Sequence, residues 1–410
     1  MLRVLLACVF SALLTTVTSA DWPEWRGPDA NMVAPPGEYP VEFGPGQNCL
    51  WQIDLGGVGA STPIVSDDAI FVSLTQDGQD TAASFDLEGN ERWRVELGEA
   101  RAGKNRAATG SNSSPVTDGE NVVFYFKSGL VVCLTTDGKE LWRENLQEKY
   151  GPDTLWWDLG TSPVLTSAGV CIAVMQEGDS YLVTLDLENG DEVWKTKRQY
   201  RRPRESDQSY TTPTVIDNNG QETIVTFGAD HLTGHDAKTG KLLWDREGFN
   251  PEEKGMWRVI ASATIADGLA VVPFGRAEFV TAVPLSDDGE PKWQQRGVGS
   301  DVPSPVVADG KVFLLGDRGE VACLDFESGD VLWEDRLPRG RDKYYSSPLL
   351  AGGNLYCLRQ DGMLFVVSAG DEFQLVAEND LGDESVATPI PVDGTLLVRT
   401  RNRLFRFGAK

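Results

Sequence analysis

One unit of roughly 40–50 residues recurs along the whole chain, and this repetition restricts the folds open to it. The clearest copy, residues 303–333, reads PSPVVADGKVFLLGDRGEVACLDFESGDVLW. Its short apolar runs are separated by turn residues, and the fourth run ends in Trp333. This pattern predicts a meander of four antiparallel strands, with Asp-Gly and Ser-Gly at turns that need a left-handed backbone. One such sheet cannot bury its faces alone, so successive copies must pack against each other.

Each unit begins with a short motif and ends with a tryptophan. The starts are STP at 61–63, SSP at 113–115, TSP at 161–163, TTP at 211–213, a degenerate ASA at 261–263, PSP at 303–305, SSP at 346–348 and ATP at 387–389. The ends are Trp51, Trp93, Trp142, Trp194, Trp244, Trp293 and Trp333, with Leu375 in the eighth position. We interpret these tryptophans as structural wedges between neighbouring sheets rather than as a platform for a ligand.

The starts and ends do not pair in chain order. Trp51 precedes the first start, and the start at 387 has no ending strand after it. Residues 50–55, LWQIDL, look like the ending strands of the other units, and a ring in which they complete the last unit leaves no open sheet edge. The sequence therefore predicts an all-β fold, an eight-bladed β-propeller over residues 50–408, closed by the N-terminal strand joining the last blade.

The first twenty residues have the composition of a secretory signal peptide. Residues 1–20, MLRVLLACVFSALLTTVTSA, carry one Arg, an apolar run and small residues before Asp21. We therefore expect an exported protein, in the periplasm or cell envelope or secreted, with no transmembrane span in the mature chain. Cys8 is interpreted as part of the apolar signal core rather than as a lipoprotein cleavage site. Residues 21–49 are expected to form a tail before the propeller.

The remaining composition narrows the classes of function. The five other cysteines include no CxxC and no adjacent pair, which argues against a disulfide framework or a metal cluster. The formal net charge of −25 argues against a nucleic-acid binder. No G-x-S-x-G elbow, P-loop or H-E-x-x-H motif occurs. His231 and His235 lie in a predicted turn and strand, where four residues span about 13 Å, so no metal site is predicted.

Charged residues sort unequally onto the two faces that such a propeller must have. Connections from strand four to the next strand one, and from strand two to strand three, open on one face, and the other turns open on the opposite face. The opposite face collects Asp and Glu, whereas the first face collects Arg, Lys and aromatic residues, among them Arg276, Arg318, Lys343, Trp156, Trp157 and Tyr210. We predict a binding surface on the first face, with the candidate residues Arg101, Lys104, Arg106, Arg201, Arg202, Trp257, Arg258, Arg341 and Tyr345.

Two explanations of this charge pattern remain open. Arginine forks and aromatic faces would hold an anionic ligand, such as a sulfated or uronic glycan, an acidic peptide or a phosphorylated molecule. Alternatively, Asp-Gly turns acidify one face through turn preference alone, and the other face keeps an ordinary share of arginine. Turn preference does not explain the arginine clusters within 198–204 and 336–343.

Four stretches carry a resemblance to known proteins: DWPEWRGP at 21–28, SPVTDGENVVFYF at 114–126, ADHLTGHDAKTGKLLW at 229–244 and FQLVAENDLGDESVATPIPVDG at 373–394. The repeat is similar to the PQQ-type propeller repeat of quinoprotein dehydrogenases and of the outer-membrane assembly factor BamB. The whole mature chain resembles a family of secreted bacterial PQQ-like propeller proteins. The resemblance implies the propeller fold, and a fold by itself does not imply a function.

Three functions follow as hypotheses. The main one is a non-catalytic, monomeric binding or scaffold protein whose basic face takes an anionic glycan, an anionic small molecule, or an envelope or extracellular protein. A PQQ-dependent oxidoreductase that uses calcium is one alternative. The chain departs from that class, because it has no adjacent Cys-Cys, no extra domain and no recognisable calcium-binding set, so no cofactor is expected. A BamB-like outer-membrane protein assembly factor is the other alternative.

Overall fold

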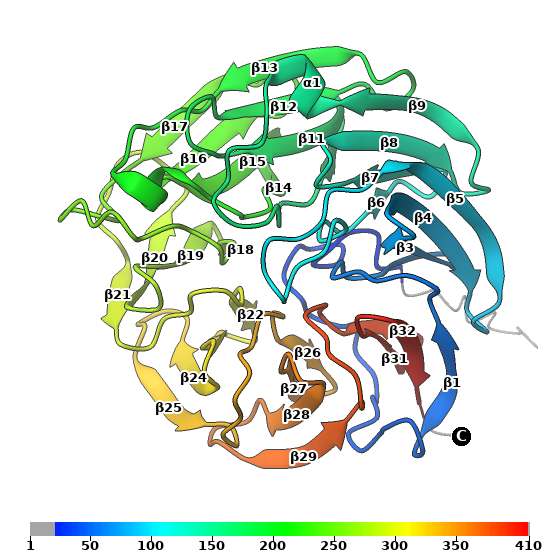
Figure 1. Ribbon diagram of the computed structural model, residues 1–410. Coiled ribbons are helices and arrows are strands. Elements are labelled where there is room, and N and C mark those ends of the chain that lie inside the picture. Colours follow the sequence, from blue (N-terminus) through cyan, green and yellow to red (C-terminus); the bar gives the residue numbers. More distant parts are fainter. Residues whose placement is uncertain (1–20, 409–410) are drawn as a thin grey trace, which may run out of the picture.

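The computed structural model describes residues 21–408, which form eight four-stranded antiparallel sheets arranged as blades around a central channel (Figure 1). The predicted eight-bladed β-propeller is therefore confirmed. The predicted signal peptide, residues 1–20, lies outside the described residues. Helical structure in the described part is limited to α1 (Leu146–Tyr150) and the 3-10 turn η1 (Arg204–Asp207).

Each blade runs from an inner strand beside the channel to an outer strand. Blades one to four contain β2 (Ile64–Ser66), β3 (Ala69–Gln76), β4 (Gln79–Asp86) and β5 (Glu91–Glu99); β6 (Val116–Thr117), β7 (Asn121–Tyr125), β8 (Leu130–Thr135) and β9 (Glu140–Asn145); β10 (Val164–Thr166), β11 (Gly169–Val174), β12 (Tyr181–Leu185) and β13 (Glu192–Lys197); and β14 (Thr214–Asn218), β15 (Gln221–Gly228), β16 (His231–Asp236) and β17 (Leu242–Arg246). Blades five to eight contain β18 (Thr264–Ala266), β19 (Leu269–Phe274), β20 (Phe279–Pro284) and β21 (Trp293–Arg296); β22 (Val306–Ala308), β23 (Lys311–Leu315), β24 (Glu320–Asp325) and β25 (Val331–Arg336); β26 (Leu349–Ala351), β27 (Asn354–Leu358), β28 (Met363–Ser368) and β29 (Leu375–Asp380); and β30 (Ile390–Val392), β31 (Thr395–Arg399), β32 (Arg403–Phe407) and β1 (Cys49–Asp54).

The eighth blade closes the ring as the sequence predicts. β1 is its outer strand and pairs antiparallel with β32, with Gln52 opposite Phe405. In Figure 1 the blue β1 lies beside the red β32. The first and last strands of the propeller thereby share one sheet, and the ring has no open seam between its ends.

A ring of hydrogen bonds also joins the eight blades around the channel. In each start motif, the main-chain N–H of the middle residue donates to the side-chain hydroxyl of the middle residue in the next motif. The middle residues are Thr62, Ser114, Ser162, Thr212, Ser262, Ser304, Ser347 and Thr388, with N···O distances of 2.9 to 3.2 Å. Thr388 donates to Thr62, which completes the circle. The degenerate motif keeps Ser262, so the hydroxyl rather than the proline is common to all eight copies.

The blade tryptophans lie between consecutive blades. Trp142 Nε1 donates to Leu187 O of the next blade at 2.8 Å. The same turn contains Gly190, whose φ is 76° and where a Cβ would lie 2.7 Å from the Trp142 ring. The turn glycine is therefore needed both for its backbone conformation and for the space that the indole occupies. Equivalent bonds join Trp51 to Leu87, Trp93 to Thr136, Trp194 to Ala237, Trp293 to Phe326 and Trp333 to Gly370, whereas the indole nitrogen of Trp244 has no partner among the described residues.

Residues 21–48, which we call the tail, fold back into the channel from the face of short turns. Trp22 is 1% exposed and exchanges two main-chain hydrogen bonds with Val65 of β2, at 2.8 and 3.0 Å. Arg26 is buried and donates to Ala263 O, Thr264 Oγ1 and Pro305 O of blades five and six. The tail therefore ties distant blades together from the inside and fills one end of the channel.

Apolar side chains from neighbouring blades form the core. A large cluster joins blades one, six, seven and eight to the tail through side chains such as Trp22, Met32, Phe43 and Tyr356. The thiols of Cys133, Cys171, Cys323 and Cys357 are buried in strands. Between residues 21 and 408, no helix combines the length and the apolar character needed to span a membrane.

Candidate functional site at the mouth of the channel

The face of long connections carries the open end of the channel. A chamber of about 410 Å3 lies there, and Trp25 from the tail lines it together with Trp157, Tyr210 and Tyr345. Five middle residues of the start motifs also line it: Thr62, Ser114, Ser162, Ser347 and Thr388. The chamber therefore combines aromatic rings, hydroxyl groups and a few charged side chains, which is the composition of a ligand-binding cavity.

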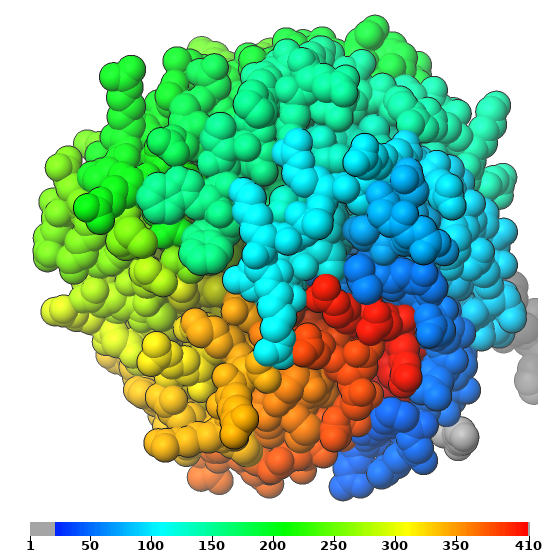
Figure 2. Space-filling view, in the orientation of Figure 1, coloured from blue at the N-terminus to red at the C-terminus, as the bar shows by residue number. Residues whose placement is uncertain are grey.

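Residues 100–109, which we call the strap, extend over this chamber from the connection between blades one and two. Asn105, Ala107 and Ala108 line the chamber. At the tip, Arg106 Nη2 lies 2.6 Å from Glu384 Oε1, and Arg401 Nη1 donates to Arg106 O at 3.0 Å. Figure 2 shows this cyan segment projecting across the centre of the face toward the orange and red blades. The strap thus joins the connection between blades one and two to blade eight and to the connection before it.

A buried ion pair anchors the base of the strap. Lys127 Nζ contacts Asp158 Oδ1, and their side chains are 1% and 4% exposed. Asp158 also accepts hydrogen bonds from the main-chain N–H groups of Lys104 and Asn105, at 2.8 and 2.9 Å. A buried carboxylate is tolerated only when it is paired and hydrogen-bonded, so Asp158 holds the strap in one position.

The structure does not bring the nine predicted binding residues together. Arg258 and Tyr345 line the chamber, and Lys104 and Arg106 belong to the strap. The other exposed candidates are Arg101, Arg201 and Arg341, none of which lines the chamber. Arg101 donates from Nη1 to Gln147 Oε1 at 2.7 Å.

Two further candidates, Trp257 and Arg202, do not line the chamber either. Trp257 is 9% exposed and packs edge-on against Phe274 and Phe279 in the core near blade five. Its ring therefore belongs to the fold, because little of it is left to contact a ligand. Arg202 Nη2 lies 2.6 Å from His231 Nε2, outside the residues that line the mouth.

The mouth is of mixed charge rather than uniformly basic. Arg258 forms ion pairs with Glu205 at 3.2 Å and with Asp301 at 3.4 Å. Lys343 pairs with Asp317 at 2.8 Å. Burial raises the pKa of Asp301, and the neighbouring Arg258 opposes this shift. Carboxylates drawn from the long connections thus compensate several of the cations that the sequence places on this face.

The two histidines have structural partners. His231 Nδ1 lies 2.6 Å from Asp245 Oδ1, and the ring of Tyr200 stacks on the imidazole at 3.6 Å. His235 is buried, and burial followed by the charge of Arg198 lowers its pKa to about 4. Within residues 21–408, no group of three or more His, Cys, Asp or Glu side chains is placed to hold a metal ion.

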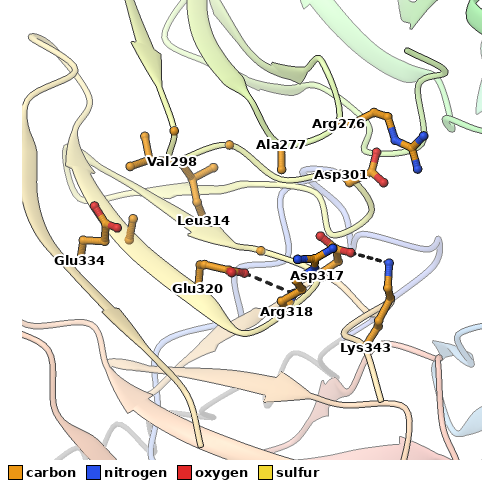
Figure 3. A pocket seen from close by; sticks show the side chains of 14 residues that line it. Arg276, Ala277, Val298, Asp301, Leu314, Asp317, Arg318, Glu320, Glu334 and Lys343 are labelled. Carbon is orange, nitrogen blue, oxygen red and sulfur yellow. Dashed lines mark hydrogen bonds and ion pairs between the residues drawn. The ribbon is translucent and has the colours of Figure 1, made fainter. Parts of the chain in front are cut away.

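A groove of about 370 Å3 leaves the chamber between blades five and six (Figure 3). It shares Arg276, Asp301 and Lys343 with the chamber, so the two cavities meet at these residues. At its other end lie Val298 and Glu334 (Figure 3). The groove therefore leads from the outer part of blade six into the mouth.

Three successive connections form a platform beside the chamber, which we define as residues 151–160, 199–210 and 250–260. Hydrogen bonds join them, including Glu205 N to Gly255 O at 2.9 Å and Tyr210 N to Val259 O at 2.9 Å. The platform carries three large exposed apolar side chains: Trp156 at 45%, Trp157 at 45% and Met256 at 42% exposure. Exposed apolar groups gathered on one surface are typical of interaction sites.

Sequence reasoning did not identify several residues that form the inner wall of the chamber or anchor the strap. The middle hydroxyls of the start motifs were visible as a repeated Ser or Thr, and their recurrence was the available signal. Trp25 lies in the quoted stretch 21–28, but nothing local shows that this stretch enters the channel. The partnership of Lys127 with Asp158 joins two different connections and has no signature in a single sequence.

The chain matches the family model described as outer membrane protein assembly factor BamB, over residues 46–210, 182–296 and 276–407. It is 29% identical over 297 residues to the outer membrane protein assembly factor BamB of Escherichia coli (strain K12), an alignment that covers 68% of this chain and 69% of that protein. It is 24% identical over 360 residues to BamB of Burkholderia pseudomallei (strain K96243), covering 77% of this chain and 86% of that protein.

Solved structures show the same fold. The crystal structure of BamB from Moraxella catarrhalis superposes with a TM-score of 0.63 at 13% identity, covering 88% of this chain and 98% of that chain. A europium-containing methanol dehydrogenase superposes with a TM-score of 0.72 at 10% identity, covering 95% of this chain and 98% of that chain. At these identities the likeness concerns the fold and does not distinguish a binding protein from an enzyme.

Proposed function

This chain belongs to the family of the outer membrane protein assembly factor BamB, and from that premise we propose that it is an exported, non-catalytic scaffold that binds a protein partner during outer membrane protein assembly. The relatives in this family are named as outer membrane protein assembly factors. The fold alone would allow an enzyme as well, so the argument for a scaffold rests on the surface and on the donor groups of the mouth.

The platform is the observation that carries this proposal. Trp156, Trp157 and Met256 expose close to half of their surface, on connections that hydrogen bonds hold in place. Lys127 and Asp158 further fix the neighbouring strap. A rigid surface with large aromatic side chains loses little entropy when a partner covers it, which is the property of an interaction hot spot.

The residues of the chamber do not fit PQQ bound with calcium. Calcium takes six to eight oxygen ligands, several of them from carboxylates. The carboxylates that line the chamber are Asp158 and Asp301. Asp158 is engaged by Lys127 and by two main-chain N–H groups, and Asp301 pairs with Arg258. This donor set favours a scaffold over the oxidoreductase alternative.

A cross-linking experiment in cells tests the proposal. A photo-reactive phenylalanine analogue is placed at position 156 in the full chain, and the control carries it at Leu332, which is 46% exposed on the outer strand β25. We expect position 156 to cross-link to a component of the β-barrel assembly machinery and position 332 to give no such product. The variant W156A/W157A should lower the amount of outer-membrane β-barrel proteins toward the level of a gene deletion, while L332A should not.

The opposite results would count against the scaffold role. A deletion strain with normal outer-membrane protein levels would remove the link to assembly. Cross-links of equal strength at positions 156 and 332 would show that the platform is not a specific surface. Thermal unfolding of W156A/W157A has to match that of the unmodified protein, so that a loss of folding is not mistaken for a loss of binding.

A further inference from the structure

The groove between blades five and six has features that the platform lacks. Arg276 and Arg318 both line it, and neither guanidinium forms a hydrogen bond or ion pair with another residue of the described chain. Lys343, the third cation of the groove, pairs with Asp317, and Glu320 pairs with Arg336. Asp301 lies near Arg276, and Glu334 lines the outer part of the groove. Arg276 and Arg318 still have N–H groups without hydrogen-bond partners among the described residues, which favour an occupant with a negative charge at the inner end, because a guanidinium binds a carboxylate through two parallel N–H groups.

Three glycines line part of the groove. Gly297, Gly299 and Gly316 lie beside the side chains of Val298 and Leu314, so no side chain covers the backbone at the glycines. The main-chain N–H groups of Val298 and Gly299 donate to no other residue between positions 21 and 408. A Cβ at Gly299 would lie 2.6 Å from Phe279 O, so glycine is required at this position. Donors of this kind suit the carbonyl groups of an extended polypeptide, as in peptide recognition through the main chain.

The inner end of the groove meets the chamber. Arg276, Asp301 and Lys343, which Figure 3 labels in the groove, also line the chamber. Beyond them the chamber is walled by Trp157, Tyr210 and Tyr345 and has Trp25 at its base. A chain that lies in the groove would therefore place its next side chain among aromatic rings, where an apolar or aromatic group is held best.

We propose that this groove and the chamber together bind an extended segment of a partner polypeptide in which a carboxylate side chain is followed by an aromatic one. The carboxylate lies against Arg276 and Arg318, main-chain carbonyls accept from Val298 and Gly299, and the aromatic ring enters the chamber. This inference rests on the proposed scaffold function and specifies the kind of polypeptide that the scaffold recognises. It differs from a purely anionic site, because both the charge and the ring are required.

Peptide binding to the full mature chain tests this inference. The probe is an N-acetylated, C-amidated peptide of threonines that contains one aspartate next to one phenylalanine, and its affinity is measured by calorimetry at low and moderate salt. Two further peptides replace the aspartate by asparagine or the phenylalanine by alanine. We expect each replacement to weaken binding at least fivefold. R276E/R318E should weaken the aspartate peptide at least tenfold and abolish its preference over the asparagine peptide.

Matched variants separate the two halves of the site. Y345A should weaken the phenylalanine peptide and leave the alanine peptide unchanged, because it removes only a wall of the chamber. R201E is the control for charge reversal, since Arg201 is exposed on the same face and lines neither cavity. R201E should bind all three peptides as the unmodified protein does.

Several outcomes would overturn the inference. Equal affinity for the aspartate and asparagine peptides would remove the role of the arginines. No binding at millimolar peptide to a folded protein would remove the site, and equal competition by acetate or inorganic phosphate would show a simple anion site. If these tests fail while position 156 still cross-links to the assembly machinery, only the groove is wrong. If the peptide binds as expected but the cross-link and the deletion phenotype are absent, the assembly function is wrong.

Discussion

Arginine has different roles at the two ends of the channel. At the end closed by the tail, Arg26 is buried and donates three hydrogen bonds to blades five and six. At the open end, Arg276 is exposed beside the same two blades, lies near Asp301 and forms no hydrogen bond or close ion pair with the described residues. The three bonds of Arg26 offset much of the cost of burying its guanidinium, whereas an exposed guanidinium can remain available to a ligand.

This difference separates residues that maintain the fold from residues that could bind. At the closed end the tail takes up the donors and acceptors of the inner strands. At the open end the long connections leave a chamber, a groove and exposed aromatic side chains. Substitutions at the closed end should therefore change stability, and substitutions at the open end should change binding or local mobility.

The largest effect is expected from Trp22→Ala in the tail. Its side chain is 1% exposed and fills the channel beside β2. Loss of a buried tryptophan typically costs about 3–5 kcal/mol, because it removes apolar contacts and leaves a cavity. Urea denaturation followed by circular dichroism measures this loss. Trp25→Ala is the matched control, since Trp25 is only partly buried where it lines the chamber, and equal losses for the two variants would contradict the division between the ends.

Lys127→Ala should have the next largest effect, although Lys127 lies at the open end. The change leaves Asp158 buried without its cation, which is expected to cost about 3 kcal/mol. It should also loosen the strap, because Asp158 holds the main chain of Lys104 and Asn105. Limited proteolysis within residues 100–109 measures the second effect. A variant that is destabilised but resists cleavage of the strap would show that the ion pair supports the core rather than the strap.

The repeated features of this fold could be predicted from the sequence. Strand four, the turn glycine and the tryptophan recur with fixed spacing, because each blade must pack on the next in the same way. Trp142 and Gly190 show the reason, since the indole of one blade occupies the space where a side chain of the next would lie. Ring closure could also be predicted, because residues 50–55 copy the outer strand of a repeat.

The site could be predicted only in outline. The face was identified by its connections, but the connections are irregular, and the partners of their charged residues come from distant parts of the chain. Arg106 meets Glu384, and Arg258 meets Glu205 and Asp301, so a list of basic residues overstated the charge of the mouth. Trp257 has the residue type of a ligand platform but is buried by Phe274 and Phe279. Such long-range pairings depend on the assembled ring and have no local pattern.

A smaller change in stability is expected from Glu24→Gln in the tail, and this change depends on pH. Burial raises the pKa of Glu24 from about 4.5 to about 7, and the nearby Arg26 opposes the shift. The folded state therefore binds this proton more tightly than the unfolded state does, so its contribution to stability is present below pH 4.5 and is lost as pH rises toward 7. Glu24→Gln should remove this part of the slope when urea midpoints are compared between pH 4.5 and 8.

The unmodified protein has to be the reference for this comparison. Asp80, Asp207 and Asp230 also have pKa values raised to about 6 or 7, mainly by burial, so some slope should remain in the variant. Asp80→Asn is the matched comparison, because Asp80 is buried in β4 outside the tail and its variant should remove a different part of the slope. Identical pH profiles for Glu24→Gln and the unmodified protein would show that Glu24 is solvated in the channel.

The smallest effect on stability is expected from Arg106→Ala at the tip of the strap. Its ion pairs with Glu384 and Asp342 are exposed, and pairs of this kind contribute little because water and salt screen them. The urea midpoint should therefore stay within experimental error, while hydrogen exchange at residues 106–108 becomes faster. Exchange at Lys104 and Asn105 should not change, because Asp158 still accepts from both N–H groups. Arg341→Ala should change neither quantity. A loss of stability as large as that of Lys127→Ala would mean that the tip holds the ring together, and the open end would then share the structural role of the closed end.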